Sequence, residues 1–165
     1  MEDAFSINAV ALVNGKPQTL GLKELLQVFI THRIEVVRRR SEFRKAKASA
    51  RLTLVDGLLK AIIDIDKVIK IIRGSDDAAT AKEALIKGFK LSDEQVTYIL
   101  DMPLRRLTKM SKLDLETEEK DLKSTISSLS TLLKSEENIK NQVAAELTAV
   151  GKSFATPRRT KIGVA

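Results

Sequence analysis

The spacing of apolar residues changes near residue 22 and predicts a mainly α-helical protein that begins with a short β-hairpin. β-forming residues run from Ile7 to Val13, and Asn14-Gly15 then supplies a pair that favours a two-residue hairpin turn. From Leu22 onward, apolar residues recur at spacings of three, four and seven, which is the period of a helix. We therefore expect a hairpin within residues 1–21 and helices after it.

Two long stretches, residues 22–55 and 113–150, carry an apolar stripe too narrow to face a globular core. The first stripe thins from large residues to alanines, and the second has gaps at Glu136 and Lys140. A narrow stripe of this kind needs one partner helix, as in a coiled coil. The two helices would be roughly 51 Å and 57 Å long at about 1.5 Å per residue. We expect them to lie antiparallel as a two-helix arm.

The intervening segment, residues 56–112, is more apolar and predicts a small globular tip. Nine large aliphatic residues fall within residues 58–72, which is more than one helix face can hide. Gly57 is the first residue that could stop the long helix. Residues 151–165, beyond the return helix, are expected to form an exit segment.

Local signals predict further helices inside the tip. Ser75 could cap a short helix from residue 76 to about residue 88. Ser92 and Gln95 form a capping-box pattern at the start of the next helix. Pro103 should end or kink that helix, because proline lacks a backbone donor and clashes with the preceding turn.

Charge is unevenly distributed along the chain. The 29 Lys and Arg residues outnumber 22 Asp and Glu, giving a net charge of +7, which favours a polyanionic partner. Residues 32–51 are strongly basic and residues 113–150 are acidic, so the two arm helices should attract each other. No apolar run is long enough to span a bilayer, and the first residues do not resemble a signal peptide. We expect a soluble cytoplasmic protein with no membrane partner.

Few residues suggest catalysis. The absence of Cys and the single His exclude thiol nucleophiles, thiolate metal sites and multi-histidine metal sites. Gly151-Lys152-Ser153 lacks the first glycine of a phosphate-binding loop, and Asp64 and Asp66 would point about 200° apart on a helix. His32 has no second ligand at helical spacing. Tyr98 is the only tyrosine and a possible nucleophile towards phosphodiesters, but we interpret it as a half-buried packing residue.

Several segments closely resemble the A subunit of bacterial type IIA DNA topoisomerases, the family of DNA gyrase and topoisomerase IV. The resemblance covers essentially the whole chain, and its most specific segment is Ile99-Leu-Asp-Met-Pro-Leu-Arg-Arg-Leu-Thr108. The other matching segments are Ile7–Pro17, Val36–Phe43, Arg51–Leu58 and Pro157–Thr160. Pro103 stands where the gyrase branch often has Arg, which favours the topoisomerase IV branch.

The resemblance implies that this chain is the arm and exit gate of such a subunit. In this family two A subunits form a ring, and a transported DNA duplex leaves between the two tips. The catalytic tyrosine would lie outside this chain. The ATP and Mg²⁺ would be used by the ATPase B subunit of the holoenzyme, so no cofactor is expected here. The expected partners are a second copy through the tip, double-stranded DNA and the B subunit.

The resemblance and the apolar pattern together give candidate site residues. The predicted dimer interface lies on the tip helix and comprises Tyr98, Ile99, Met102, Pro103, Leu104 and Leu107. Possible contacts to the DNA backbone are Arg38, Arg39, Arg40 and Arg44, although the first three could instead pair with acids of the return helix. The alternatives are an independent basic nucleic-acid-binding arm, a coiled-coil scaffold that dimerises along the arm, and catalysis by Tyr98.

Overall fold

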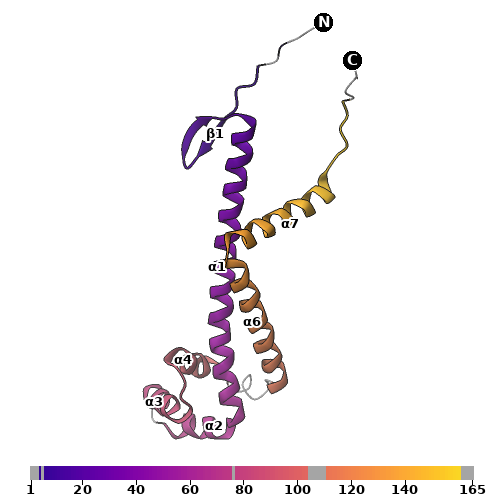
Figure 1. Cartoon of the computed structure of the whole chain (residues 1–165). Helices are drawn as coiled ribbons and strands as arrows, with labels where there is room; N and C mark the ends of the chain where they lie inside the picture. The colour runs from indigo at the N-terminus through magenta and orange to yellow at the C-terminus, as the bar shows by residue number, and fades with distance from the viewer. Residues whose placement is uncertain (1–3, 5, 76, 104–110, 161–165) are drawn as a thin grey trace. The chain divides into compact units, whose positions relative to one another are not determined.

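The computed structural model describes residue 4 and residues 6–75, 77–103 and 111–160. These residues form two strands and six helices, so the mainly α-helical class and the N-terminal hairpin are confirmed (Figure 1). The elements are β1 (Val10–Val13), β2 (Lys16–Thr19), α1 (Leu22–Ile63), α2 (Ile65–Gly74), α3 (Ala78–Phe89), α4 (Asp93–Asp101), α6 (Lys112–Leu133) and α7 (Glu136–Phe154). They divide into two compact units: Met1–Ser41 with Leu132–Ala165, and Glu42–Thr131.

The hairpin turn has the backbone that its sequence predicts. β1 and β2 pair antiparallel, with Val10 opposite Thr19 and Val13 opposite Lys16. Asn14 and Gly15 have φ angles of 52° and 78°, the left-handed values that a two-residue turn of this twist requires.

α1 is longer than the expected residues 22–55, and Gly57, the first residue that could have stopped it, does not. The helix continues through Gly57 to Ile63. A Cβ at position 57 would lie 2.8 Å from Cγ of Gln95, so the missing side chain lets α4 approach α1 closely. Gln95 uses this proximity, because its Nε2 donates to the carbonyl of Thr53 at 2.6 Å. The glycine therefore marks a helix contact instead of a helix end.

We expect Gly57→Ala to lower the free energy of unfolding by about 1 kcal/mol, because overpacking against Gln95 outweighs the better helix propensity of alanine. Gly151→Ala is the matched control, since a Cβ at this helical position in α7 meets nothing within 4 Å. That variant should be neutral or slightly more stable. Urea denaturation followed by circular dichroism measures both. Equal behaviour of the two variants would disprove the close contact.

The second unit contains the tip and its core. The buried side chains come from α1, α2, α3, α4 and α6, with one from the segment before α4: Val55, Leu58, Ala61, Val68, Ala81, Leu85, Leu91, Val96, Ile99 and Leu115. α1 and α6 run antiparallel in this unit, because Arg51 pairs with Glu118 while Leu58 and Leu115 share the core. The predicted globular segment therefore does form a core, and the end of α1 is part of it.

Of the two helix caps predicted in the tip, the structure has the one at Ser92 and lacks the one at Ser75. Ser92 accepts a hydrogen bond from the amide of Gln95, whose side chain in turn accepts from the amide of Ser92, so the capping box is confirmed. The prediction that Ser75 caps the following helix is wrong. Asp77 is the cap of α3 and accepts from the amide of Thr80 at 2.6 Å, whereas the Ser75 hydroxyl donates back to Ile71 in α2. α4 ends at Asp101, just before Pro103 as expected.

The return stretch is two helices, so the prediction of one continuous helix over residues 113–150 is wrong. α6 ends at Leu133 and α7 begins at Glu136. Ser135 caps α7 by accepting from the amide of Asn138 at 3.2 Å, and Glu136 and Glu137 place negative charge in its first turn. These residues stabilise a new helix start, which is why the chain breaks there.

The first unit makes only part of the expected coiled coil. Val37 of α1 packs with Ile139 and Val143 of α7, and all three are buried. Towards the start of α1 and the end of α7 the apolar side chains are exposed instead: Leu22, Leu26, Phe29, Ile30, Val150 and Phe154. The apolar residues of this helix pair are therefore buried around Val37 and exposed near the start of α1 and the end of α7. No helix within the described ranges is long and apolar enough to cross a membrane.

Candidate functional site

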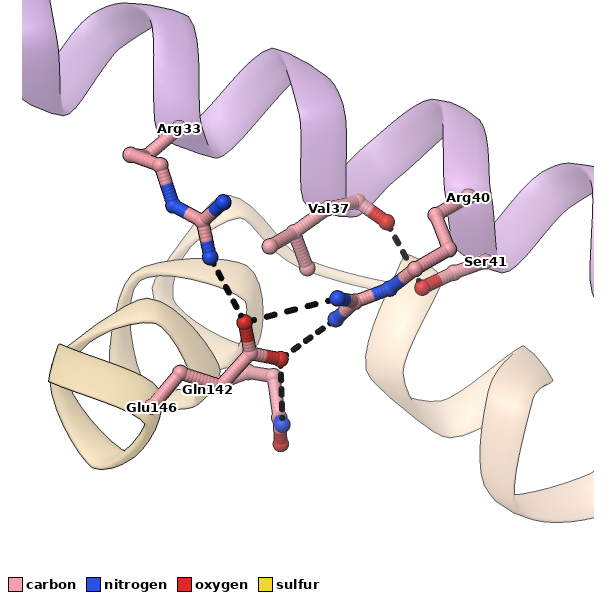
Figure 2. Close-up of polar contacts among 6 residues, drawn as sticks. All are labelled: Arg33, Val37, Arg40, Ser41, Gln142 and Glu146. Carbon is pink, nitrogen blue, oxygen red and sulfur yellow. Dashed lines mark hydrogen bonds and ion pairs between the residues drawn. The ribbon is translucent and has the colours of Figure 1, made fainter. Parts of the chain in front are cut away.

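A carboxylate clamp joins α1 to α7 in the first unit (Figure 2). Glu146 of α7 accepts from Arg33 at 2.9 Å and from Arg40 through both guanidinium ends, and Gln142 donates to it at 3.0 Å. The Glu146 side chain is only 24% exposed. The hydrogen bonds from Arg40 and Gln142 hold the pKa of Glu146 below its ordinary value. In this clamp one carboxylate, that of Glu146, forms ion pairs with two arginines of α1.

The neighbouring arginines are also paired with acids. Arg38 donates to Glu136 of α7 at 2.9 Å, and Arg39 donates to Glu35 of α1 at 2.5 Å. Among the four residues suggested for DNA contact, Arg38, Arg39 and Arg40 thus have carboxylate partners. Arg44 is exposed and has no carboxylate partner among the described residues.

A second polar cluster lies in the other unit, where the arm meets the tip. Arg51 of α1 donates to Glu118 of α6 through two nitrogens, at 2.6 and 3.0 Å, and to the hydroxyl of Tyr98 in α4 at 3.1 Å. The bidentate bond lowers the pKa of Glu118 and raises that of Arg51. One guanidinium therefore connects three helices.

This contact is one that the sequence did not reveal. Tyr98 is half-buried and packs against the tip core, as expected for a packing residue. Its arginine neighbour is 47 positions away, so no local motif could show it. Arg51 is held by Glu118 and donates to the Tyr98 hydroxyl, so the hydrogen-bond partner shown for this hydroxyl is a cation and not a general base.

The predicted interface residues lie in different environments. Ile99 is 2% exposed and belongs to the core of its own tip, whereas Met102 is half-buried and Pro103 is exposed. Tyr98, Met102 and Pro103 thus offer accessible surface on and just beyond α4. Leu104 and Leu107 lie outside the described residues, so their part in the interface stays a prediction.

Other chemistry suggested by the sequence finds no support in the geometry. Among the residues that the structure describes, no group of three or more His, Asp or Glu side chains could hold a metal ion. Asp64 caps no backbone group with its side chain and separates α1 from α2. His32 lines a groove of about 550 Å³ between the hairpin and α1, with Glu35 and Arg38. That groove mixes both signs of charge and does not define a ligand class.

The described parts of the chain thus form a helical protein with an ion-paired helix pair in each unit and an apolar tip. The sequence model of one family, described as the A subunit of DNA gyrase/topoisomerase IV, matches residues 1–148. The chain belongs to this family.

Individual relatives support the same assignment. The chain is 45% identical over 158 residues to the DNA gyrase A subunit of Borrelia hermsii, covering 96% of this chain and 20% of the relative. It is 41% identical over 162 residues to the probable chloroplastic/mitochondrial DNA gyrase A subunit of Oryza sativa subsp. japonica, covering 98% of this chain and 17% of the relative. The DNA gyrase A subunit of Brachyspira hyodysenteriae is 40% identical over 162 residues, with 98% and 19% covered. The chain spans about a fifth of the length of these relatives.

Proposed function

We propose that this chain is the exit gate and coiled-coil region of the A subunit of an ATP-dependent type IIA DNA topoisomerase. Two copies would meet through their tips and part to release a transported duplex. Family membership supports the parent activity. The observation that carries the gate assignment is the compact tip, because it presents Tyr98, Met102 and Pro103 on and just beyond one helix above its own core.

The remaining roles follow from the same proposal. The chain would supply no catalytic residue, and ATP and Mg²⁺ would act on the B subunit of the holoenzyme. Its partners would be a second copy of the same chain, double-stranded DNA and the B subunit, in the cytoplasm. A twofold contact that opens in every cycle should be nearer the standard total of about 1,600 Å² than the size of an obligate dimer. The family model spans both gyrase and topoisomerase IV, so supercoiling and decatenation are both compatible with it.

Pro103→Glu tests the gate. The parent chain should sediment at about 37 kDa, twice the 18.3 kDa of one copy. Proline 103 is exposed, so glutamate should leave the tip folded, while two like charges across a twofold contact should weaken dimerisation by on the order of 100-fold. Sedimentation equilibrium over a wide concentration range measures this constant.

Thr97→Glu is the matched control, because it adds the same charge to an exposed position of α4 beside the proposed contact. It should stay dimeric, and circular dichroism should show both variants folded. A parent chain that is monomeric at every concentration would refute the gate. A dimer that survives Pro103→Glu would place dimerisation elsewhere, as in the coiled-coil scaffold.

A further inference from the structure

The basic stretch of α1 divides into neutralised and unneutralised cations. Arg33, Arg38, Arg39 and Arg40 pair with acids in the first unit, and Arg51 pairs with Glu118 in the second. Between them Arg44, Lys45 and Lys47 have no carboxylate partner among the described residues, and of these three Arg44 and Lys47 are exposed. The available positive charge of α1 therefore lies one to two turns after the cluster that the sequence suggested.

These two cations lie on one face of α1, beside a groove in the second unit. They are three residues apart, which puts them on neighbouring turns of the same helix face. The groove runs between α1 and α6, holds about 550 Å³ and contains no carboxylate among its lining residues. Its walls include Arg44, Lys47 and Ala48 from α1 and Leu122, Thr125 and Leu129 from α6. Arg51 and Ser128 complete the lining, and because Arg51 is paired with Glu118, the unpaired cations of the groove are Arg44 and Lys47.

The apolar walls also suit this role. Arginine and lysine side chains lay their methylene stems along apolar surface and keep the charged ends in water. Ala48, Leu122 and Leu129 supply such surface below Arg44 and Lys47. The charged ends are thus free for a large external polyanion instead of being drawn into an internal ion pair.

We propose that Arg44 and Lys47 form a sequence-independent contact for the phosphate backbone of double-stranded DNA. The contact relies on regularly spaced phosphates and reads no base. This inference rests on the proposed function for the presence of a duplex beside the arm. It also corrects the residue set, since it replaces Arg38, Arg39 and Arg40 with Lys47 and retains Arg44.

The test compares two charge-matched double variants of this chain. Arg44→Gln with Lys47→Gln removes the two exposed, unpaired cations that line the groove, and Arg38→Gln with Arg39→Gln removes two paired ones. Fluorescence anisotropy measures binding of a random-sequence duplex of about 30 base pairs at several salt concentrations. The first variant should reduce the slope of log K against log salt by about 1.8, since each phosphate contact contributes about 0.9. Between about 50 and 200 mM salt, the parent should lose about twelve-fold more affinity than this variant.

The control variant should keep a slope within about 0.5 of the parent value. Circular dichroism verifies that both variants are folded. An unchanged slope in the Arg44 and Lys47 variant, or an equal loss in the control, would overturn the proposal. So would a parent chain that binds no duplex at low salt, which would leave the apolar groove to an acidic amphipathic partner. Sedimentation of the same variants separates this test from the gate, because both should remain dimeric if the gate proposal is correct.

Discussion

Leu58→Ala should lower the free energy of unfolding of the tip by about 2–5 kcal/mol. Leu58 is completely buried at the point where α1 enters the tip, and it packs in one core with Leu85 and Val96. Removing three carbons would leave a cavity bounded by helices that contact one another, so the core cannot collapse freely. Urea denaturation followed by tyrosine fluorescence measures the effect. Tyr98 is the only tyrosine, the chain has no tryptophan, and this side chain packs against the same core.

Leu113→Ala provides the control for this prediction. Leu113 belongs to the second unit but is 70% exposed on α6, so the same truncation should cost less than about 0.5 kcal/mol. If both leucines gave the same small change, the tip core would not be the element that stabilises this unit.

Glu146→Gln should have the second largest effect, with a cost of about 1–3 kcal/mol in the first unit. The carboxylate accepts hydrogen bonds from two arginines and a glutamine, and bonds to charged groups of this kind contribute more than neutral ones. Arg33, Arg40 and Glu146 are all partly exposed, so water screens their interaction. The expected loss of stability is therefore well below that of breaking a fully buried ion pair. Hydrogen exchange at the amides of Ile139 and Val143 reports this unit directly, because both residues are buried against α1.

The effect of Glu146→Gln should also depend on pH. The pKa of Glu146 is lowered in the folded chain, so its stabilisation is fully present above the ordinary carboxyl value of 4.5. The stabilisation is lost as the pH falls through the lower, folded value, because the protonated group no longer holds the arginines. Parent and variant should therefore differ at pH 7 and converge as the pH falls below 4.5 and through the lower, folded value.

Glu42→Gln is the control, since Glu42 is exposed with no ion pair among the described residues. A difference that persists in acid would contradict the role of the clamp.

Local patterns predicted those elements whose cause lies within a few residues. Asn14-Gly15 and the pair Ser92 and Gln95 are stabilised by contacts across one to three positions, and both have the expected structure. The break before α7 had a local signal as well, because Ser135 followed by two glutamates is a strong helix start. The apolar residues keep a heptad-like spacing on both sides of Ser135, and this spacing led to the prediction of one continuous helix. Gly57 could not be interpreted locally, since its neighbour Gln95 is brought to it by the packing of the tip.

The sequence by itself determined the mainly α-helical class, the hairpin and the family, because these depend on composition, short-range periodicity and specific segments such as Ile99–Thr108. Only the tertiary structure decided which cations of α1 are neutralised. The partners of Arg38 and Arg40 are 98 and 106 positions away, and the partner of Arg51 is 67 positions away. Ion pairing depends on distances of a few ångströms between such residues, which the packing of the helices sets and no local pattern encodes.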